Sequence, residues 1–260
     1  MKLHSNKILL MLLILISGTL YIVGCTHKDE PVPASVSTGV KINHGNHIHL
    51  PGLTAGDTTQ WKLDQVHSNV GWSTPYDAVG APLTGRFNAF GVANITPAAM
   101  INYVTTGQPL PDTSWAFYEN QPAKTHFAGY VQINTSNTGE PARDGGCFLS
   151  TMGTTSFVSG TQNLTVSNIA YLQSTSIAFD PAGNDYLATF NFTWQGKLSA
   201  PHTESIVGKL TYVPEALVSG TESYFGLELQ FQFNCRDYGI TATDIADVIS
   251  IDINLNFDNK

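Results

Sequence analysis

The chain has 260 residues, of which only 12 % are charged, and a formal net charge of −8. This acidic balance excludes the basic face that a phosphate backbone requires, so we expect no nucleic-acid partner. About 200 residues follow the polar N-terminal region, which is a usual size for one β-sandwich or barrel domain.

The first 24 residues have the organisation of a secretory signal peptide. Lys2 and Lys7 are followed by an apolar run over 8–16, which is shorter than the roughly 20 residues needed to cross a bilayer. The sequence Ile22-Val23-Gly24-Cys25 is similar to the lipobox of bacterial lipoproteins. That similarity implies cleavage before Cys25 and acylation of this residue. Several acyl chains would then hold the protein on a membrane, at about 0.8 kcal/mol per buried methylene group.

Residues 25–58 are predicted to be the lipidated Cys and a flexible tether, because they are rich in Pro, Gly, Ser and Thr and show no apolar periodicity. His44, His47 and His49 lie here, but no neighbouring Cys or carboxylate completes a metal site, and we predict none. We expect the protein in the cell envelope, anchored to the outer membrane and facing the periplasm or the outside.

Residues 59–260 are predicted to form the folded domain, and their dominant period is two. In three segments, 190–195, 227–234 and 249–258, apolar and polar residues alternate strictly. Successive side chains of a strand point to opposite faces, so each segment has one apolar and one polar face. Weaker alternation and turn residues predict further strands, about eight or nine in all. The fold class is therefore all-β, an antiparallel barrel or a sandwich.

Several short motifs in this domain resemble the YceI-like family in their order and spacing. They are Trp61-Lys62-Leu63-Asp64 with His67-Ser68, Gly85-Arg86-Phe87, Asn137-Thr138-Gly139 with Arg143-Asp144, Phe192-Thr193-Trp194-Gln195-Gly196, and Arg236-Asp237-Tyr238-Gly239. The resemblance implies a lipocalin-like antiparallel β-barrel of about eight strands that holds a polyisoprenoid or a related long apolar molecule. The segment 96–124 is longer than its family counterpart, and its Trp115, Phe117 and Tyr118 make it a candidate lid over the barrel mouth.

The inward face of such a barrel is the candidate binding site. An eight-stranded barrel is just wide enough to be filled by its own side chains or to hold one slender ligand. The residues that we expect to line a site for an alkyl or isoprenoid chain are Trp72, Phe87, Phe192, Trp194, Phe231 and Phe233. The alternative is that these side chains pack against one another and leave no space.

The remaining polar and sulfur-containing residues are given structural roles. With Cys25 acylated, Cys147 and Cys235 remain as a pair in a compartment where disulfides persist, and we predict a bond between them; two buried free thiols are the alternative. Asp64 and His67 are expected to form a hydrogen-bonded element of the first strand. Four residues are candidates for a salt-bridged cluster at one end of the barrel: Arg143, Asp144, Arg236 and Asp237.

The sequence contains none of the common catalytic signatures, so we predict a binding protein with no catalytic residues rather than an enzyme. The predicted ligand is a long apolar lipid, isoprenoid- or quinone-like, held for sequestration or transport; apart from such a lipid we predict no cofactor. The alternative is a structural or stress-related envelope module that acts through its surface. The family resemblance leaves homodimer formation open.

Overall fold

The computed structural model describes residues 61–76, 80–93, 115–117, 122–145, 165–183, 185–219 and 222–259, with single positions between 96 and 106. The predicted signal peptide, Cys25 and the tether lie outside the described residues and stay predictions. In the described part of the chain, no helix combines the length and the apolar character needed to span a membrane.

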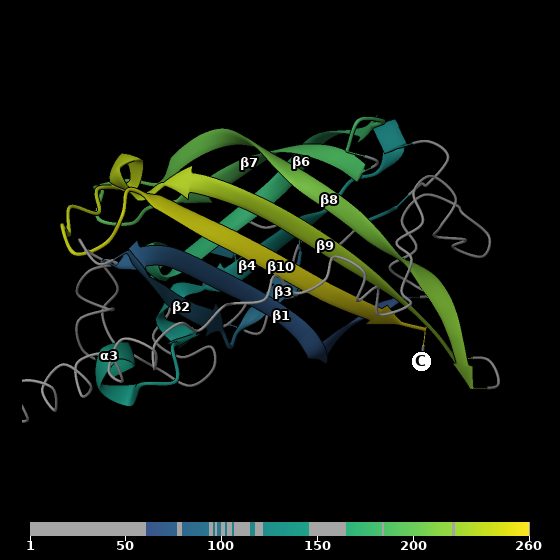
Figure 1. Ribbon diagram of the computed structural model, residues 1–260, viewed down its shortest axis with the longest axis horizontal. Coiled ribbons are helices and arrows are strands. Elements are labelled where there is room, and N and C mark those ends of the chain that lie inside the picture. The colour runs from purple at the N-terminus through teal and green to yellow at the C-terminus, as the bar shows by residue number, and fades with distance from the viewer. Residues whose placement is uncertain are drawn as a thin grey trace, which may run out of the picture. The chain divides into compact units, whose positions relative to one another are not determined.

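The described residues form an antiparallel, curled ten-stranded sheet in the order β3-β4-β6-β7-β8-β9-β10-β1-β2-β5 (Figure 1). The strands are β1 (Lys62–Tyr76), β2 (Ala81–Phe87), β3 (Phe90–Val92), β4 (Ala128–Gln132), β5 (Ser136–Asn137), β6 (Ile169–Asp180), β7 (Asp185–Trp194), β8 (His202–Ser219), β9 (Glu222–Asn234) and β10 (Val248–Asp258). The α-helix α3 (Pro141–Gly145) and the 3-10 turns η4 (Pro122–Lys124), η5 (Ile133–Thr135), η6 (Val166–Asn168) and η7 (Cys235–Tyr238) complete the elements whose bounds are described. The all-β prediction is confirmed.

The alternation seen in the sequence sets which side chains enter the core. In β7, Phe190, Phe192 and Trp194 are 0 %, 7 % and 1 % exposed, whereas the intervening Asn191 is exposed. Phe231 and Phe233 of β9 are buried in the same way. The inner face of the sheet is therefore apolar and its outer face polar, as expected for strands that cover one core.

Two of the strands in this order are short because their chain segments are interrupted. Residues 88–89 separate β2 from β3, and η5 separates β4 from β5. Backbone hydrogen bonds cross the interruption, from Asn88 N to Thr135 O (3.1 Å) and from Gln132 N to Ala89 O (2.9 Å). The pairing between the segment 81–92 and the segment 128–137 therefore continues along both of them.

The predicted element at the start of the first strand is a bulge in β1. The register with β10 shifts between Asp64 and Asn69. Asp64 Oδ2 lies 2.5 Å from His67 Nδ1, and this hydrogen bond is the main reason why the pKa of Asp64 lies below its ordinary value. Ser68 Oγ donates to Asp64 O (2.6 Å) and accepts from Asn256 N (2.8 Å), which secures the bulge on β10. His67 points to solvent, so the pair has the structural role that was predicted.

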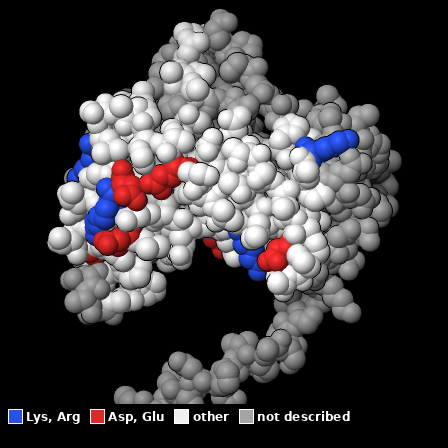
Figure 2. All heavy atoms as spheres, turned by 90° about the horizontal axis from the view of Figure 1, so that it is seen from above, with Lys and Arg blue, Asp and Glu red and all other residues white. Residues whose placement is uncertain are grey.

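Charged side chains are sparse on the outer surface. Figure 2 shows one face of the molecule, where small groups of both signs lie among neutral residues. Lys209 of β8 and Asp185 of β7 form an ion pair, with 2.9 Å between Nζ and Oδ2. The hydrogen bond and the charge of Asp185 raise the pKa of Lys209. The described atoms on the face seen in Figure 2 form no broad patch of one sign.

A candidate ligand-binding cavity inside the sheet

A cavity of about 510 Å3 lies on the inner face of the curled sheet. Its wall is formed mainly by apolar side chains of β1, β2, β3, β4, β6, β7, β9 and β10. The volume falls within the roughly 300–1,000 Å3 of small-molecule sites in proteins. The volume and the mainly apolar wall suit an apolar small molecule.

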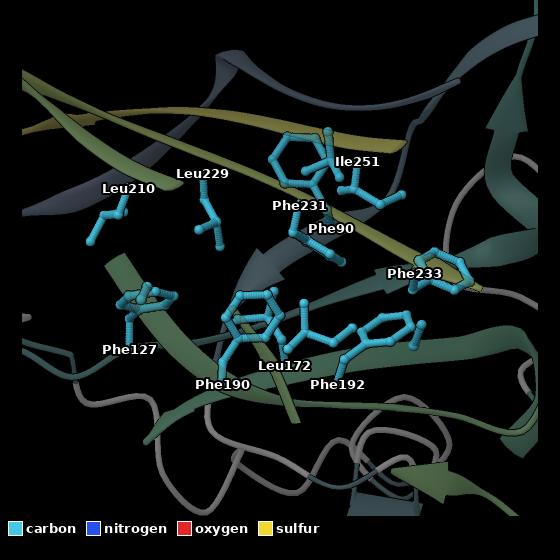
Figure 3. Packing of buried hydrophobic residues seen from close by; sticks show 14 of the residues in the cluster. Phe90, Phe127, Leu172, Phe190, Phe192, Leu210, Leu229, Phe231, Phe233 and Ile251 are labelled. Atoms are coloured by element: carbon cyan, nitrogen blue, oxygen red, sulfur yellow. The ribbon is translucent and has the colours of Figure 1, made fainter. Parts of the chain in front are cut away.

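All six residues predicted to line a binding site are placed on the wall of this cavity: Trp72, Phe87, Phe192, Trp194, Phe231 and Phe233. Figure 3 shows Phe192, Phe231 and Phe233 directed into the apolar interior from β7 and β9. Contact between these side chains and a ligand stays a prediction.

The alternative that the side chains pack against one another is realised in part of the interior, because β7 and β9 pack their rings across β8; a ligand on these residues stays a prediction. Phe190 and Phe231 are 4.9 Å apart between ring centroids, with the rings nearly perpendicular, and Phe192 and Phe233 are also 4.9 Å apart. Gly208 of β8 makes this approach possible, since an added Cβ would lie 3.0 Å from Phe190 Cε1. The aromatic side chains thus fill the space over β8. The unfilled space, which is the cavity, lies next to β1, β2, β4 and β6.

Trp72 links three strands on the cavity wall. Its ring covers Gly85 of β2, where an added Cβ would lie 2.6 Å from the indole. The indole Nε1 donates to Ser136 Oγ of β5 (2.9 Å), so the buried polar atom of the ring is satisfied. The glycine of the Gly85-Arg86-Phe87 motif is therefore required for the close packing of this ring.

One end of the cavity is closed by an aromatic cluster, which we call the closed end: Trp61, Trp115, Phe117, Phe225 and Phe257. Phe225 and Phe257 stack with 4.7 Å between centroids, and Trp115 lies 4.7 Å from Phe257. All five side chains are at most 4 % exposed. Backbone bonds between Ala116 and His126 hold the segment 115–117 in place. The segment predicted as a lid thus contributes to the closed end; Tyr118 lies outside the described residues.

The opposite end, which we call the open end, is lined by exposed residues. Tyr76 is 44 % exposed, and Ala81, Pro82 and Asp244 are exposed as well. The two charged residues among those lining the cavity, Arg143 and Asp244, are also found here. Figure 1 shows α3, the end of β1 and the turn before β10 at the same end of the sheet, on the left of the picture. The described wall is therefore buried and aromatic at the closed end. At the open end it is exposed to solvent and includes two charged residues.

The salt-bridged cluster predicted from four residues is not formed. Arg236 pairs with Asp247, with 2.7 Å between Nε and Oδ1, and donates to the carbonyl oxygens of Ile240, Ala242 and Ile245 at 2.7–2.9 Å. Asp144 instead accepts from Thr138 N and Thr138 Oγ1. The prediction was wrong because other partners satisfy these side chains: Asp247 and three carbonyl groups for Arg236, and Thr138 for Asp144. Arg236 thereby holds the loop that carries Ile245 to the open end.

The predicted bond between Cys147 and Cys235 is not seen at Cys235, whose thiol is free and fully buried. Its Sγ lies 3.6 Å from Ala246 O. Burial raises the pKa of this thiol and makes it a poor nucleophile. Cys147 lies outside the described residues, so the pairing itself stays a prediction.

Tyr238 is a buried tyrosine beneath the open end, packed on Trp194 at 5.5 Å between ring centroids. Its hydroxyl has no hydrogen-bond partner among the described residues. Burial raises the pKa of Tyr238 above its ordinary value of 10.0, and the negative charges of Glu204 and Asp237 raise it further.

This raised pKa predicts an alkaline loss of stability. Above pH 10 the unfolded chain ionises Tyr238 and the folded chain does not, so stability present below pH 10 falls as the pH rises, by at most about 1.4 kcal/mol per pH unit. We expect the urea midpoint of the natural chain to fall more between pH 9 and 11 than that of Tyr238→Phe. Equal pH dependence in the two proteins would contradict this prediction.

The wall also contains residues that the sequence analysis did not name as lining residues, including Leu227, Leu229, Ile249, Ile251 and Ile253. They belong to the same alternating runs of β9 and β10, so the periodicity itself was the signal that could have found them. Phe90 and Leu172 have weaker patterns around them, and only the tertiary fold places them on the wall.

No family model matches the chain, and no curated protein matches it. Solved structures with a similar fold include BcnA of Burkholderia cenocepacia (15 % identity, TM-score 0.45, covering 75 % of this chain and 99 % of that one). A polyisoprenoid binding domain from Saccharophagus degradans, implicated in plant cell wall breakdown, has 12 % identity and a TM-score of 0.43, covering 77 % and 99 %. The YCEI protein of Campylobacter jejuni has 15 % identity and a TM-score of 0.44, covering 69 % and 86 %. The resemblance to YceI-like proteins noted in the sequence thus recurs among the structural matches, at low identity.

Proposed function

We propose that the protein binds one long apolar lipid chain inside a closed, lipocalin-like barrel of about eight strands and keeps it out of water. The observation that carries the proposal is the cavity of about 510 Å3 with its aromatic and aliphatic wall. Each Å2 of apolar surface taken from water contributes about 25 cal/mol, so a long chain needs few polar contacts to bind.

The continuity of two chain segments supports the proposed closure of the barrel. If β2 with β3 counts as one strand, and β4 with β5 as another, the ten strands of the sheet become eight. The first of these pairs with β1 on one side and with the second on the other, and the second also pairs with β6. The ring of hydrogen bonds then has no free edge, which protects a cavity from solvent along its length.

An isoprenoid- or quinone-like lipid is our first candidate, because the motifs of the sequence resemble those of the YceI-like family. We further propose that Cys25 carries acyl chains and that residues 26–58 tether the domain to the outer membrane. Binding and release near a bilayer would suit sequestration or transport of a lipid through an aqueous compartment.

The proposal is tested by native mass spectrometry of the mature chain, produced with its signal sequence and purified from the envelope, followed by organic extraction. A discrete adduct whose extract is a polyprenyl or quinone species is the expected result. A protein that carries no adduct and takes up neither farnesol nor a short-chain quinone would overturn the proposal. It would favour the alternative, an envelope module that acts through its surface.

A further inference from the structure

We propose that Arg143 binds an anionic head group, so that the ligand is a single-chain amphiphile with a carboxylate or phosphate at one end. This inference rests on the proposed function and adds to it the class and the orientation of the ligand. The tail occupies the apolar cavity, and the charged head remains at the open end.

The orientation follows from the difference between the two ends of the cavity. At the closed end, Phe117 and Phe257 are at most 1 % exposed and present only apolar atoms. At the open end, Tyr76 and Asp244 are exposed. Transfer of a charged group into the closed end would cost far more than a polar contact returns, so an amphiphile enters tail first.

Arg143 is the one cation among the described residues that line the cavity, and it is half-buried. Within the described part of the chain its guanidinium has no ion pair or hydrogen bond; its contacts are those of its backbone N with Glu140. A guanidinium offers five donors in a planar fork that fits a carboxylate or a phosphate with two parallel bonds. A half-buried guanidinium that has no partner among the described residues is therefore suited to binding an anion from solution.

Among the described residues, the neighbouring carboxylates form no ion pair with the Arg143 guanidinium. Glu140 accepts from the backbone N of Arg143, and Asp144 accepts from both the backbone N and the hydroxyl of Thr138. Asp244 also lines the open end, but it is exposed, and no ion pair joins it to Arg143. Asp244, Glu140 and Asp144 would all repel a head group of their own sign, so the head group must reach the Arg143 guanidinium itself.

The test compares farnesyl phosphate with farnesol and dodecanoate with dodecanol, with binding followed by intrinsic tryptophan fluorescence. We expect the natural chain to bind each anion about tenfold more tightly than its matched alcohol. Arg143→Gln should remove this preference and leave the affinity for the alcohols unchanged. Arg86→Gln is the matched control, because Arg86 lies on β2, is exposed and does not line the cavity; it should keep the preference.

The outcomes separate this inference from the proposed function. If the natural chain binds alcohols and anions equally, or if Arg143→Gln keeps the preference, the role of Arg143 is overturned while lipid binding stands. A preference for the phosphate alone, or for the carboxylate alone, that Arg143→Gln abolishes supports the inference and identifies the head. If neither alcohol nor anion binds to the natural chain, both proposals fail. Equal urea midpoints for Arg143→Gln and the natural chain would exclude misfolding as the cause.

Discussion

Farnesol is expected to bind at least about 100-fold more weakly to the variant Ala170→Trp than to the natural chain. Ala170 of β6 is 2 % exposed and lies on the cavity wall. An indole at this position would occupy space that the lipid chain needs. Displacing roughly four methylene groups, at about 0.8 kcal/mol each, corresponds to about a 200-fold loss of affinity. Isothermal titration of the purified chain with farnesol measures the change directly.

The matched control for this prediction is Gln173→Trp. Gln173 lies on the same strand three residues later, is exposed, and does not line the cavity. This variant adds the same ring to the outer face and should bind farnesol as the natural chain does. If Ala170→Trp folds with a similar urea midpoint and still binds farnesol normally, the lipid does not occupy this cavity.

The identity of the cavity wall was largely predictable, because it depends on a local property of the chain. Phe192 and Trp194 in β7, and Phe231 and Phe233 in β9, alternate with polar residues, and a period of two assigns each to one face. Burial then follows from the sheet having one covered face. The prediction needed only that the apolar face should point inward, and the structure agrees at each of these positions.

The polar contacts were less predictable, because they depend on which segments meet. Arg236 was expected to pair with one of the aspartates near it in the motifs, yet it pairs with Asp247 and with three carbonyl groups of the following loop. The path of that loop depends on tertiary packing, and sequence spacing does not describe it. The absence of a partner for the Arg143 guanidinium among the described residues is a property of the same kind, since it requires knowing that Asp144 is engaged by Thr138.

The motif glycines show the same distinction between local and tertiary causes. Gly139 and Gly196 both have a positive φ, of 80° and 54°. An added Cβ at Gly139 would meet nothing within 4 Å, whereas at Gly196 it would lie 2.3 Å from Tyr238 O. Gly139 is therefore required by the turn alone. Gly196 is required in addition because the turn after β7 packs directly on η7, where Lys197 N donates to Tyr238 O (3.0 Å).

This difference predicts a large loss of stability for Gly196→Ala and a small one for Gly139→Ala. The left-handed backbone costs a residue with a Cβ about 1–2 kcal/mol, and both variants incur this cost. Only Gly196→Ala must also displace a backbone carbonyl, which adds about 1–3 kcal/mol of overpacking. We expect urea unfolding to show a loss of about 2–5 kcal/mol for Gly196→Ala and of about 1–2 kcal/mol for Gly139→Ala.

A second pair of variants separates the two causes. Asparagine tolerates the left-handed region better than alanine does, so Gly139→Asn should recover most of the stability that Gly139→Ala loses. Gly196→Asn should recover little, because its Cβ meets the same carbonyl of Tyr238. Equal recovery at both positions would mean that the turn after β7 does not pack against η7, and that the end of the sheet near Trp194 is held in another way.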